Sequence, residues 1–362
     1  MRLLAKLTLT LGCSVFVALA ACGGAGDDSQ FGSSGGPPGS GGFGNGTGAG
    51  GENGLGNGTP TPPELEACAT SSAAAEPIPA FLVVMYDKSG SMDNDGKWEA
   101  CKAAMKGFFS SNDSKGMNAS LSFFPQGNTC NVGTFAAPSV AMTALPSNTF
   151  GQRLDQNNPN GGTPTRPALE GAVQYAQQIQ QGQGKDGKVV IVLVTDGQPN
   201  DCSSSVSSVS QVAQNAAATF PTYVIGVGSA LQNLDAIAQA GGTNQAFIVN
   251  TGNPAQTQQE LTKALNDIRE SALTCDYKIP PPPPGEELDK GKVNVTYTPN
   301  GTTAAETLSY NQSCQGGTGW RYDDPNNPTR ILMCDGSCNT IKAKPGKVDV
   351  LFGCATKGGG VQ

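Results

Sequence analysis

The sequence predicts an α/β fold in which a mostly parallel β-sheet is covered by helices on both faces. Between residues 78 and 273, short apolar runs of strand length alternate with longer segments of helical periodicity. The runs at residues 81–86 and 189–194 are apolar at nearly every position, as expected for strands that are buried on both faces. An alternation of about 200 residues is long enough to build one hydrophobic core.

The expected elements follow one another in a regular order. The strands are predicted at residues 81–86, 119–124, 189–194, 222–227 and 246–249. The helices are predicted at residues 98–109, 165–181, 205–218, 231–240 and 257–273. Such an order is typical of a doubly wound, Rossmann-like sheet, in which ligands bind beyond the carboxyl ends of the strands, where the strand order reverses.

The first 21 residues have the features of a cleaved bacterial signal peptide. Two basic residues precede an apolar segment at 7–20, which is too short to span a bilayer comfortably. The ending Leu19-Ala20-Ala21-Cys22 resembles a lipobox, in which Cys22 is acylated and becomes the new N-terminus. An ordinary signal, cut after Ala-x-Ala, is the alternative. With Gly23 next, the lipobox implies an anchor in the outer membrane of a Gram-negative cell envelope, facing the periplasm or the exterior.

Composition divides the rest of the chain into four parts. Residues 22–63 are rich in Gly and lack apolar periodicity, which predicts a lipidated Cys followed by a flexible tether. Residues 64–275 contain the α/β pattern. A run of prolines predicts a stiff spacer at residues 276–285. Residues 286–362 read as a small Cys-rich β module, with β-rich pieces at 292–297, 330–333 and 347–352.

Charge and composition exclude several classes of function. The net charge is −7 and no long basic cluster exists, which argues against a nucleic-acid partner. The chain has no histidine, so Ser-His and Cys-His catalysis and His-ligated zinc are excluded. No Glu or Lys stands in a motif that suggests a general base, which disfavours a metal-dependent hydrolase. We therefore expect a binding protein and not an enzyme.

Three segments place oxygen-bearing side chains near the ends of expected strands. The stretch "MYDKSGSM" carries Asp87, Ser89 and Ser91 directly after the first apolar run. The stretch "NGGTPTRPAL" puts Thr163 in a Gly-rich loop before a helix, and "IVLVTDGQPND" puts Asp196 after another buried strand. Because ligands of such sheets bind at the carboxyl ends of the strands, these side chains have matching chemistry at matching places in the expected sheet.

Together these segments resemble the von Willebrand factor type A domain and its metal-ion-dependent adhesion site. The family pattern is Asp-x-Ser-x-Ser, then a Thr, then the Asp of Thr-Asp-Gly, and all five positions are present in order. The resemblance implies that the three hydroxyls ligate the ion, while Asp87 and Asp196 act largely through bound water. The expected ion is Mg²⁺, with Mn²⁺ and Ca²⁺ as alternatives. A decayed site on an intact scaffold is the alternative.

The resemblance also implies a way of binding partners. Neutral hydroxyls leave the cation under-neutralised, so it attracts the carboxylate of a protein ligand into its open position. This implies adhesion or complex assembly through a metal-bridged acidic residue, with the membrane reached only through the lipid anchor. The alternative is an envelope scaffold or assembly protein with a structural or vestigial metal site, in which the C-terminal module makes the contacts.

Other polar residues near the first loop are weaker candidates. Asp93 and Asp95 suggest a calcium loop, but Lys102 occupies the place of the Glu that an EF-hand needs, which favours a solvated turn. Three further polar residues are expected near the rim of the metal site, either tuning ligand choice or lying in ordinary loops: Asp155, Asn200 and Asp201.

The cysteines fit an oxidising compartment. Of the 11, Cys13 would leave with the signal and Cys22 would be lipidated, so an odd number remains. Cys101 lies in a predicted amphipathic helix and is expected to be buried and reduced. The disulfide candidates are Cys68, Cys130, Cys202, Cys275, Cys314, Cys334, Cys338 and Cys354.

Some pairings can be anticipated. Cys130 and Cys202 should both reach the rim of the metal site, where a bond would stiffen the binding face. The resemblance implies a bond between Cys68 and Cys275, since some members of the family have a bond that clasps the ends of the domain. Such a clasp would limit movement of the helix at 257–273. Disulfides are favoured over zinc near the C-terminus, but the connectivity there stays open: Cys314, Cys334, Cys338 and Cys354.

Overall fold

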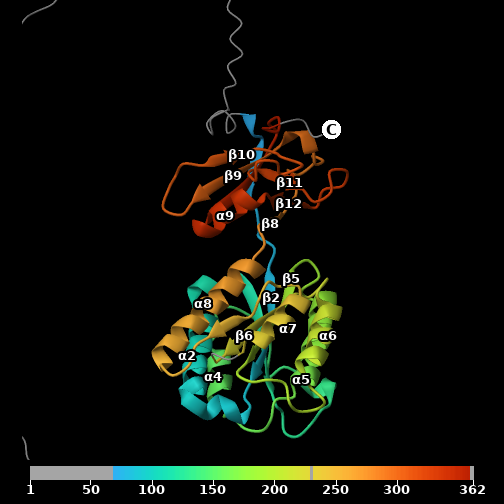
Figure 1. Ribbon diagram of the computed structural model, residues 1–362. Coiled ribbons are helices and arrows are strands. Elements are labelled where there is room, and N and C mark those ends of the chain that lie inside the picture. Colours follow the sequence, from blue (N-terminus) through green and yellow to red (C-terminus); the bar gives the residue numbers. More distant parts are fainter. Residues whose placement is uncertain (1–67, 229–230, 359–362) are drawn as a thin grey trace, which may run out of the picture. The chain divides into compact units, whose positions relative to one another are not determined.

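The computed structural model describes residues 68–228 and 231–358 (Figure 1). The predicted signal peptide, the lipidation site at Cys22 and the tether at 22–63 lie outside the described residues. Within the described part of the chain, no helix is both long and apolar enough to cross a membrane.

A six-stranded sheet forms the centre of the α/β domain, in the order β4-β3-β2-β5-β6-β7. All neighbours pair in parallel except β4, which is antiparallel to β3. The chain winds outward from β2 in both directions, so the strand order reverses between β2 and β5. The predicted doubly wound, mostly parallel fold is therefore confirmed. The strands are β2 (Ala80–Asp87), β3 (Met117–Phe124), β4 (Val140–Ala144), β5 (Lys188–Thr195), β6 (Thr222–Val227) and β7 (Phe247–Val249).

Helices cover both faces of this sheet (Figure 1). One hydrophobic cluster joins Leu82, Val84 and Tyr86 to the helices α2, α4 and α8, and a second joins Phe81 and Val83 to α5, α6 and α7. Since successive side chains of a strand point to opposite faces, β2 is buried at every position. The helices are α2 (Lys97–Ser110), α3 (Val132–Phe135), α4 (Thr149–Asp155), α5 (Thr165–Gln181), α6 (Val206–Ala216), α7 (Asp235–Ala240) and α8 (Pro254–Ala272).

The edge of the sheet differs from the prediction. The structure contains strand β4 and the short helices α3 and α4, which were not predicted from the sequence. In β4 only Val140 is buried, because an edge strand needs no apolar run. The expected helix at 231–240 is divided into a 3₁₀ turn, η3 (Gln232–Leu234), and α7.

The Cys-rich module consists of two small antiparallel sheets, in the orders β1-β13-β9-β10 and β11-β12-β8. Their core combines aromatic and aliphatic side chains, and Trp320, Tyr322 and Tyr297 are among the largest fully buried side chains. The elements are β1 (Ser71–Ala74), β8 (Asp276–Lys278), β9 (Val293–Pro299), β10 (Glu306–Leu308), β11 (Trp320–Tyr322), β12 (Arg330–Met333), α9 (Asp335–Ala343) and β13 (Gly346–Phe352).

The strand pairing corrects two predicted boundaries. β1 pairs with β13, with Ser71 opposite Phe352, and β8 pairs with β12. The chain therefore starts the module at β1, builds the α/β domain and returns to the module at β8. Residues 64–275 are not one domain, and the proline run at 276–285 lies inside the module. The strand β1 alternates between partly buried and exposed residues. Its sequence, SSAA, therefore has no run of large apolar residues that would predict a strand.

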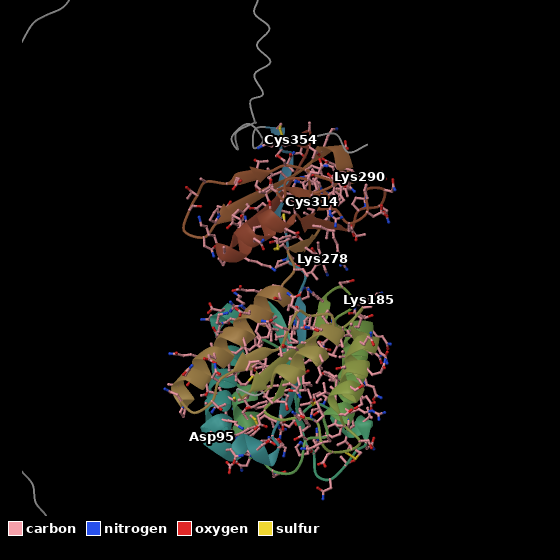
Figure 2. All side chains as sticks on the ribbon, in the orientation of Figure 1. Asp95, Lys185, Lys278, Lys290, Cys314 and Cys354 are labelled. Atoms are coloured by element: carbon pink, nitrogen blue, oxygen red, sulfur yellow. A yellow bond between two sulfur atoms is a disulfide. The ribbon has the colours of Figure 1, made fainter. Side chains whose placement is uncertain are left out.

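The described residues contain four disulfides: Cys68–Cys354, Cys130–Cys202, Cys275–Cys338 and Cys314–Cys334. The anticipated bond between Cys130 and Cys202 is present, and Cys101 is buried and free. The predicted Cys68–Cys275 clasp is wrong. Cys68 precedes β1, whose pairing brings it to Cys354 after β13, while Cys275 precedes β8 and reaches Cys338 in α9. Figure 2 labels Cys314 and Cys354 in the module.

Candidate functional site

Asp87 is the last residue of β2 and is fully buried. The backbone N–H of Ser89 donates to its Oδ1 over 2.7 Å, and the Thr195 hydroxyl donates to its Oδ2 over 2.6 Å. Thr195 is within reach because β2 and β5 are parallel neighbours that end together. Burial raises the pKa of the Asp87 carboxyl to about 7, although these hydrogen bonds lower it. A nearby cation would stabilise this buried carboxylate.

The two serines of Asp-x-Ser-x-Ser connect this loop to the end of β5. Ser89 is buried and immediately precedes the 3₁₀ turn η1 (Gly90–Gly96). Its Oγ lies 3.1 Å from Ser91 Oγ, and Ser91 Oγ donates to Asp196 Oδ1 over 2.8 Å. Since Asp196 directly follows β5, the hydroxyls join the carboxyl ends of the two central strands.

The loop before α5 holds Thr163 and is fastened to both neighbouring loops. The Gly90 N–H donates to Gly161 O over 2.9 Å, which joins it to the serine loop. The Thr163 N–H donates to Asn200 Oδ1 over 3.0 Å, and the Asn200 N–H donates to Thr163 O over 3.2 Å. These bonds fix the position of Thr163, which is 3% exposed.

Gly197, next to Asp196, lies beside two of the hydroxyls. A Cβ added to Gly197 would lie 3.8 Å from Ser91 Oγ and 3.8 Å from Thr163 Oγ1, so both hydroxyls face the same turn. The structure thus gathers all of the predicted ligand positions at one edge of the sheet: Asp87, Ser89, Ser91, Thr163 and Asp196.

The donor set of this cluster fits a hard divalent cation. Hydroxyl and carboxylate oxygens are the ligands that Mg²⁺, Mn²⁺ and Ca²⁺ prefer. Among the described residues, no group of three or more His, Cys, Asp or Glu is placed to hold a metal ion. An ion bound at this edge would therefore depend on hydroxyls, with the buried Asp87 and Asp196 supplying negative charge.

Residues 82–264, half of the chain, match the sequence model of the von Willebrand factor type A domain. The chain belongs to this family. No curated protein matches the chain closely enough to count as a relative. The assignment agrees with the strand order and with the position of the cluster at the carboxyl ends of β2 and β5.

Several solved structures are similar to this chain at low sequence identity. The von Willebrand factor type A protein from Catenulispora acidiphila is 16% identical over 80% of this chain and 61% of that protein, with a TM-score of 0.39. Proximal thread matrix protein 1 from the mussel byssus, with a zinc-occupied metal-ion-dependent adhesion site, is 18% identical over 57% and 50%, with a TM-score of 0.40. The manganese-loaded Plasmodium vivax TRAP protein is 15% identical over 66% and 94%, with a TM-score of 0.37. The chain spans less than two thirds of the first two proteins.

Lys97 is a member of the cluster that the motif does not include. It is the first residue of α2, and its Nζ donates to Asp196 Oδ2 over 2.8 Å. The Asp196 side chain is fully buried, and the Lys97 side chain is 11% exposed. The sequence alone shows Lys97 only as a charged residue at the start of a helix. Its contact with Asp196 arises because the end of β5 lies beside the start of α2 in the folded domain. Thr195 could have been found, because it precedes Asp196 in Thr-Asp-Gly.

The three residues predicted near the rim of the metal site have different roles. Asn200 fixes Thr163, as described above. Asp201 packs against Gly162, where an added Cβ would lie only 1.8 Å from its carboxylate. Asp155, in contrast, forms an exposed ion pair with Lys106 on α2.

The turn between Ser91 and α2 contains the weaker calcium-loop candidates. Asp93 and Asp95 are both exposed, and Asp95 has a left-handed backbone with φ of 56° just before α2 (Figure 2). They are turn residues that start the helix, in agreement with the solvated turn favoured by the sequence.

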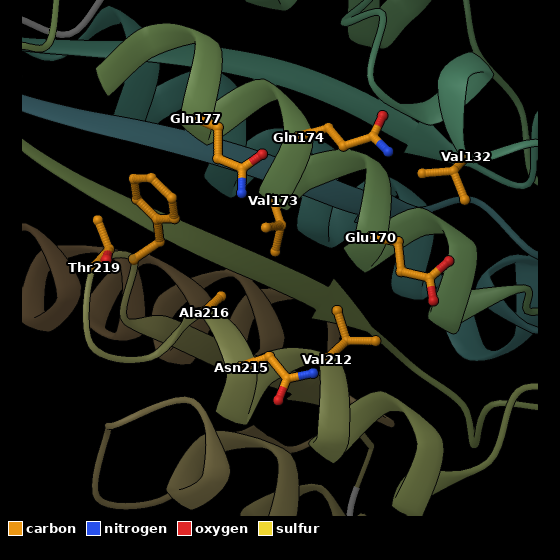
Figure 3. A pocket seen from close by; sticks show the side chains of 10 residues that line it. Val132, Glu170, Val173, Gln174, Gln177, Val212, Asn215, Ala216 and Thr219 are labelled. Atoms are coloured by element: carbon orange, nitrogen blue, oxygen red, sulfur yellow. The ribbon is translucent and has the colours of Figure 1, made fainter. Parts of the chain in front are cut away.

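A pocket between α5 and α6 is separate from the cluster of predicted metal ligands (Figure 3). Glu170, Val173 and Gln174 line this pocket from α5, and Val212 and Asn215 line it from α6. None of the predicted metal ligands is among its lining residues.

Proposed function

We propose that the type A domain binds a divalent cation at this site and uses the cation to bind a carboxylate of a protein ligand. The observation that carries the proposal is the convergence of three hydroxyls and two buried carboxylates from three loops. Ser89, Ser91 and Thr163 would hold the ion, and Asp87 and Asp196 would act through water. Neutral hydroxyls would leave positive charge on the ion, which attracts an acidic side chain from outside.

The proposed ion is Mg²⁺, with Mn²⁺ and Ca²⁺ as alternatives. The cluster offers oxygen donors, whereas zinc favours sites that include sulfur or nitrogen. We propose no catalytic role, because the chain lacks histidine and the site residues are used in binding.

We further propose that the protein is a cell-envelope lipoprotein, acylated at Cys22 and carried on the tether at 22–63. The four disulfides among the described residues support an oxidising compartment. In this setting the tether would give the type A domain reach toward its partner, in adhesion or in the assembly of a complex.

A second candidate is a scaffold whose site is structural and needs no ion. The ion pair between Lys97 and Asp196 favours this candidate, because it places positive charge beside the buried carboxylate. In a scaffold, partner binding would not change when the ion is removed by a chelator.

Calorimetric titration of Mg²⁺, Mn²⁺ and Ca²⁺ into the purified protein tests the first proposal. We expect one saturable site and a loss of at least about tenfold in affinity for Thr163→Ala, since a hydroxyl ligand is removed without any change in charge. The matched control is Asp155→Asn, which removes a carboxylate from an exposed ion pair and should leave the affinity unchanged. Absence of binding by the wild-type protein would favour the scaffold.

A further inference from the structure

We infer that Lys97 is a built-in counter-cation of the metal site, which weakens binding of the metal and keeps the loaded site attractive to anionic ligands. This inference rests on the proposed function, because it concerns the same site. It assigns a role to a residue that lies outside the family motif.

The inference starts from the way in which Asp196 is held. Lys97 Nζ donates to Oδ2 over 2.8 Å, and Ser91 Oγ donates to Oδ1 over 2.8 Å. The Lys97 ammonium also lies 3.4 Å from Ser91 O, which brings it against the serine loop. Lys97 therefore contacts both a predicted metal-binding carboxylate and the backbone of a predicted hydroxyl ligand.

The surroundings of this ion pair distinguish it from the others in the described residues. Here the carboxylate side chain is 0% exposed, whereas in the other ion pairs the carboxylates are at least 16% exposed. On the same helix, Lys102 pairs with Glu99, whose side chain is 71% exposed. Exposed pairs are screened by water and salt, but a pair with a buried carboxylate is screened much less. The charge of Lys97 is thus felt strongly at Asp196.

The charge of the site shows what Lys97 changes. The carboxylates of Asp87 and Asp196 carry two negative charges when both are ionised, and Lys97 offsets one of them. A divalent cation then leaves one net positive charge in the loaded site. Without Lys97 the net charge of the same loaded site would be zero, so its attraction for an anionic ligand would be weaker. Lys97 therefore repels the incoming metal and favours a negatively charged ligand once the metal is bound.

Metal titration of Lys97→Met provides the main test. We expect its affinity for Mg²⁺ to be at least about tenfold higher than that of the wild-type protein, because a charge next to Asp196 has been removed. Lys97→Arg keeps the charge and should stay close to wild type. Lys102→Met removes a charge from the same helix without touching Asp196 and should also stay close to wild type.

A second titration uses acetate as the probe of the Mg²⁺-loaded protein. We expect acetate to bind more weakly to loaded Lys97→Met than to the loaded wild-type protein. Fluorescence of Trp98, the neighbour of Lys97 in α2, can report binding in both proteins.

Lys97→Met leaves a buried carboxylate unpaired, so its melting temperature is measured with and without Mg²⁺. We expect Mg²⁺ to raise the melting temperature of this variant more than that of the wild type. The double variant Lys97→Met/Asp196→Asn removes both charges, and should fold without the metal while lacking the gain in affinity. If the single variant does not fold without Mg²⁺, its refolding on addition of Mg²⁺ supports the inference, and failure to refold overturns it.

The outcomes separate this inference from the proposed function. If the wild-type protein binds Mg²⁺ and Lys97→Met binds it no more tightly, the inference is overturned and the proposed function stands. If only Lys97→Met binds Mg²⁺, Lys97 is shown to block the site and the inference is supported. If neither protein binds Mg²⁺, both are overturned.

Discussion

The α/β domain and the Cys-rich module obtain their stability in different ways. In the domain, β2, β3 and β5 each have eight residues and are nearly all buried, and two hydrophobic clusters cover the sheet. In the module, several strands have only three or four residues, and three disulfides join its segments. A small core buries too little apolar surface to be stable without cross-links, which explains the difference.

The two tryptophans of the chain allow the regions to be followed separately. Trp98 lies in α2 and stacks on Tyr86, with ring centroids 5.2 Å apart. Trp320 lies in the core of the module and makes edge-to-face contacts with Tyr310 and Tyr322. The variants Trp98→Phe and Trp320→Phe each leave one reporter.

The largest expected effect is the loss of the module on reduction of its disulfides. Removal of a native disulfide from a small domain costs about 2–5 kcal/mol of unfolding free energy, and the module has three. In denaturant titrations with a reducing agent, Trp320 should become exposed at a much lower concentration than before. Trp98 is the comparison and should shift less, because its domain loses only the Cys130–Cys202 bond and keeps two large hydrophobic clusters. Equal shifts at both tryptophans would contradict the comparison.

The α/β domain should respond more to pH, because its site contains a buried carboxylate. The pKa of Asp87 is raised from an ordinary 3.8 to about 7, so between these values the folded protein keeps a proton that the unfolded chain releases. In the metal-free protein the free energy of unfolding should therefore fall as pH rises through this window, by up to about 1.4 kcal/mol per pH unit.

Denaturation in the presence of a chelator, followed through Trp98, measures this fall. Asp87→Asn should show a smaller slope, because the amide of Asn does not titrate in this pH range. Saturating Mg²⁺ should also reduce the slope, since a bound cation stabilises the ionised form. The same slope in the wild type and in Asp87→Asn would show that Asp87 is not its source.

A smaller effect is expected for Gly162→Ala in the loop before α5. The new Cβ would lie 1.8 Å from Asp201 Oδ2, so the two loops must move apart, at a cost of about 1–3 kcal/mol. Gly107→Ala is the matched control. It lies in α2 with nothing within 4 Å of the new Cβ, and should stabilise the protein by about 0.5–1 kcal/mol. Thermal denaturation should give shifts of opposite sign, and similar losses in both variants would argue against the crowded contact.

The smallest effect is expected for Asn200→Ala, which removes the side-chain bond to the Thr163 N–H. We expect a loss of about 0.5–1.5 kcal/mol in Mg²⁺ binding, because Thr163 is then held less firmly. Asn215→Ala, in the pocket between α5 and α6, is the control and should bind Mg²⁺ as the wild type does. Unchanged binding by Asn200→Ala would show that Thr163 is held sufficiently by the rest of its loop.

Local patterns in the sequence were sufficient to predict the α/β fold and to point to five candidate metal ligands. The predicted helix at 165–181 coincides with α5, and the predicted strand at 222–227 coincides with β6. Apolar periodicity reports burial directly, and the polar residues at the strand ends are marked by their spacing. Each of these signals spans only a few neighbouring residues, so it can be recognised without the three-dimensional structure.

Long-range contacts could not be predicted in this way. Cys68 and Cys354 are separated by 286 positions, and β1 has no apolar signal that would show its pairing with β13. Lys97 and Asp196 are 99 positions apart, and neither residue type specifies the other as its partner. Their pairing depends on the parallel alignment of β2 and β5, which brings the start of α2 to the end of β5. The chain therefore encodes its candidate metal ligands locally, while the charge around them is set by the folded sheet.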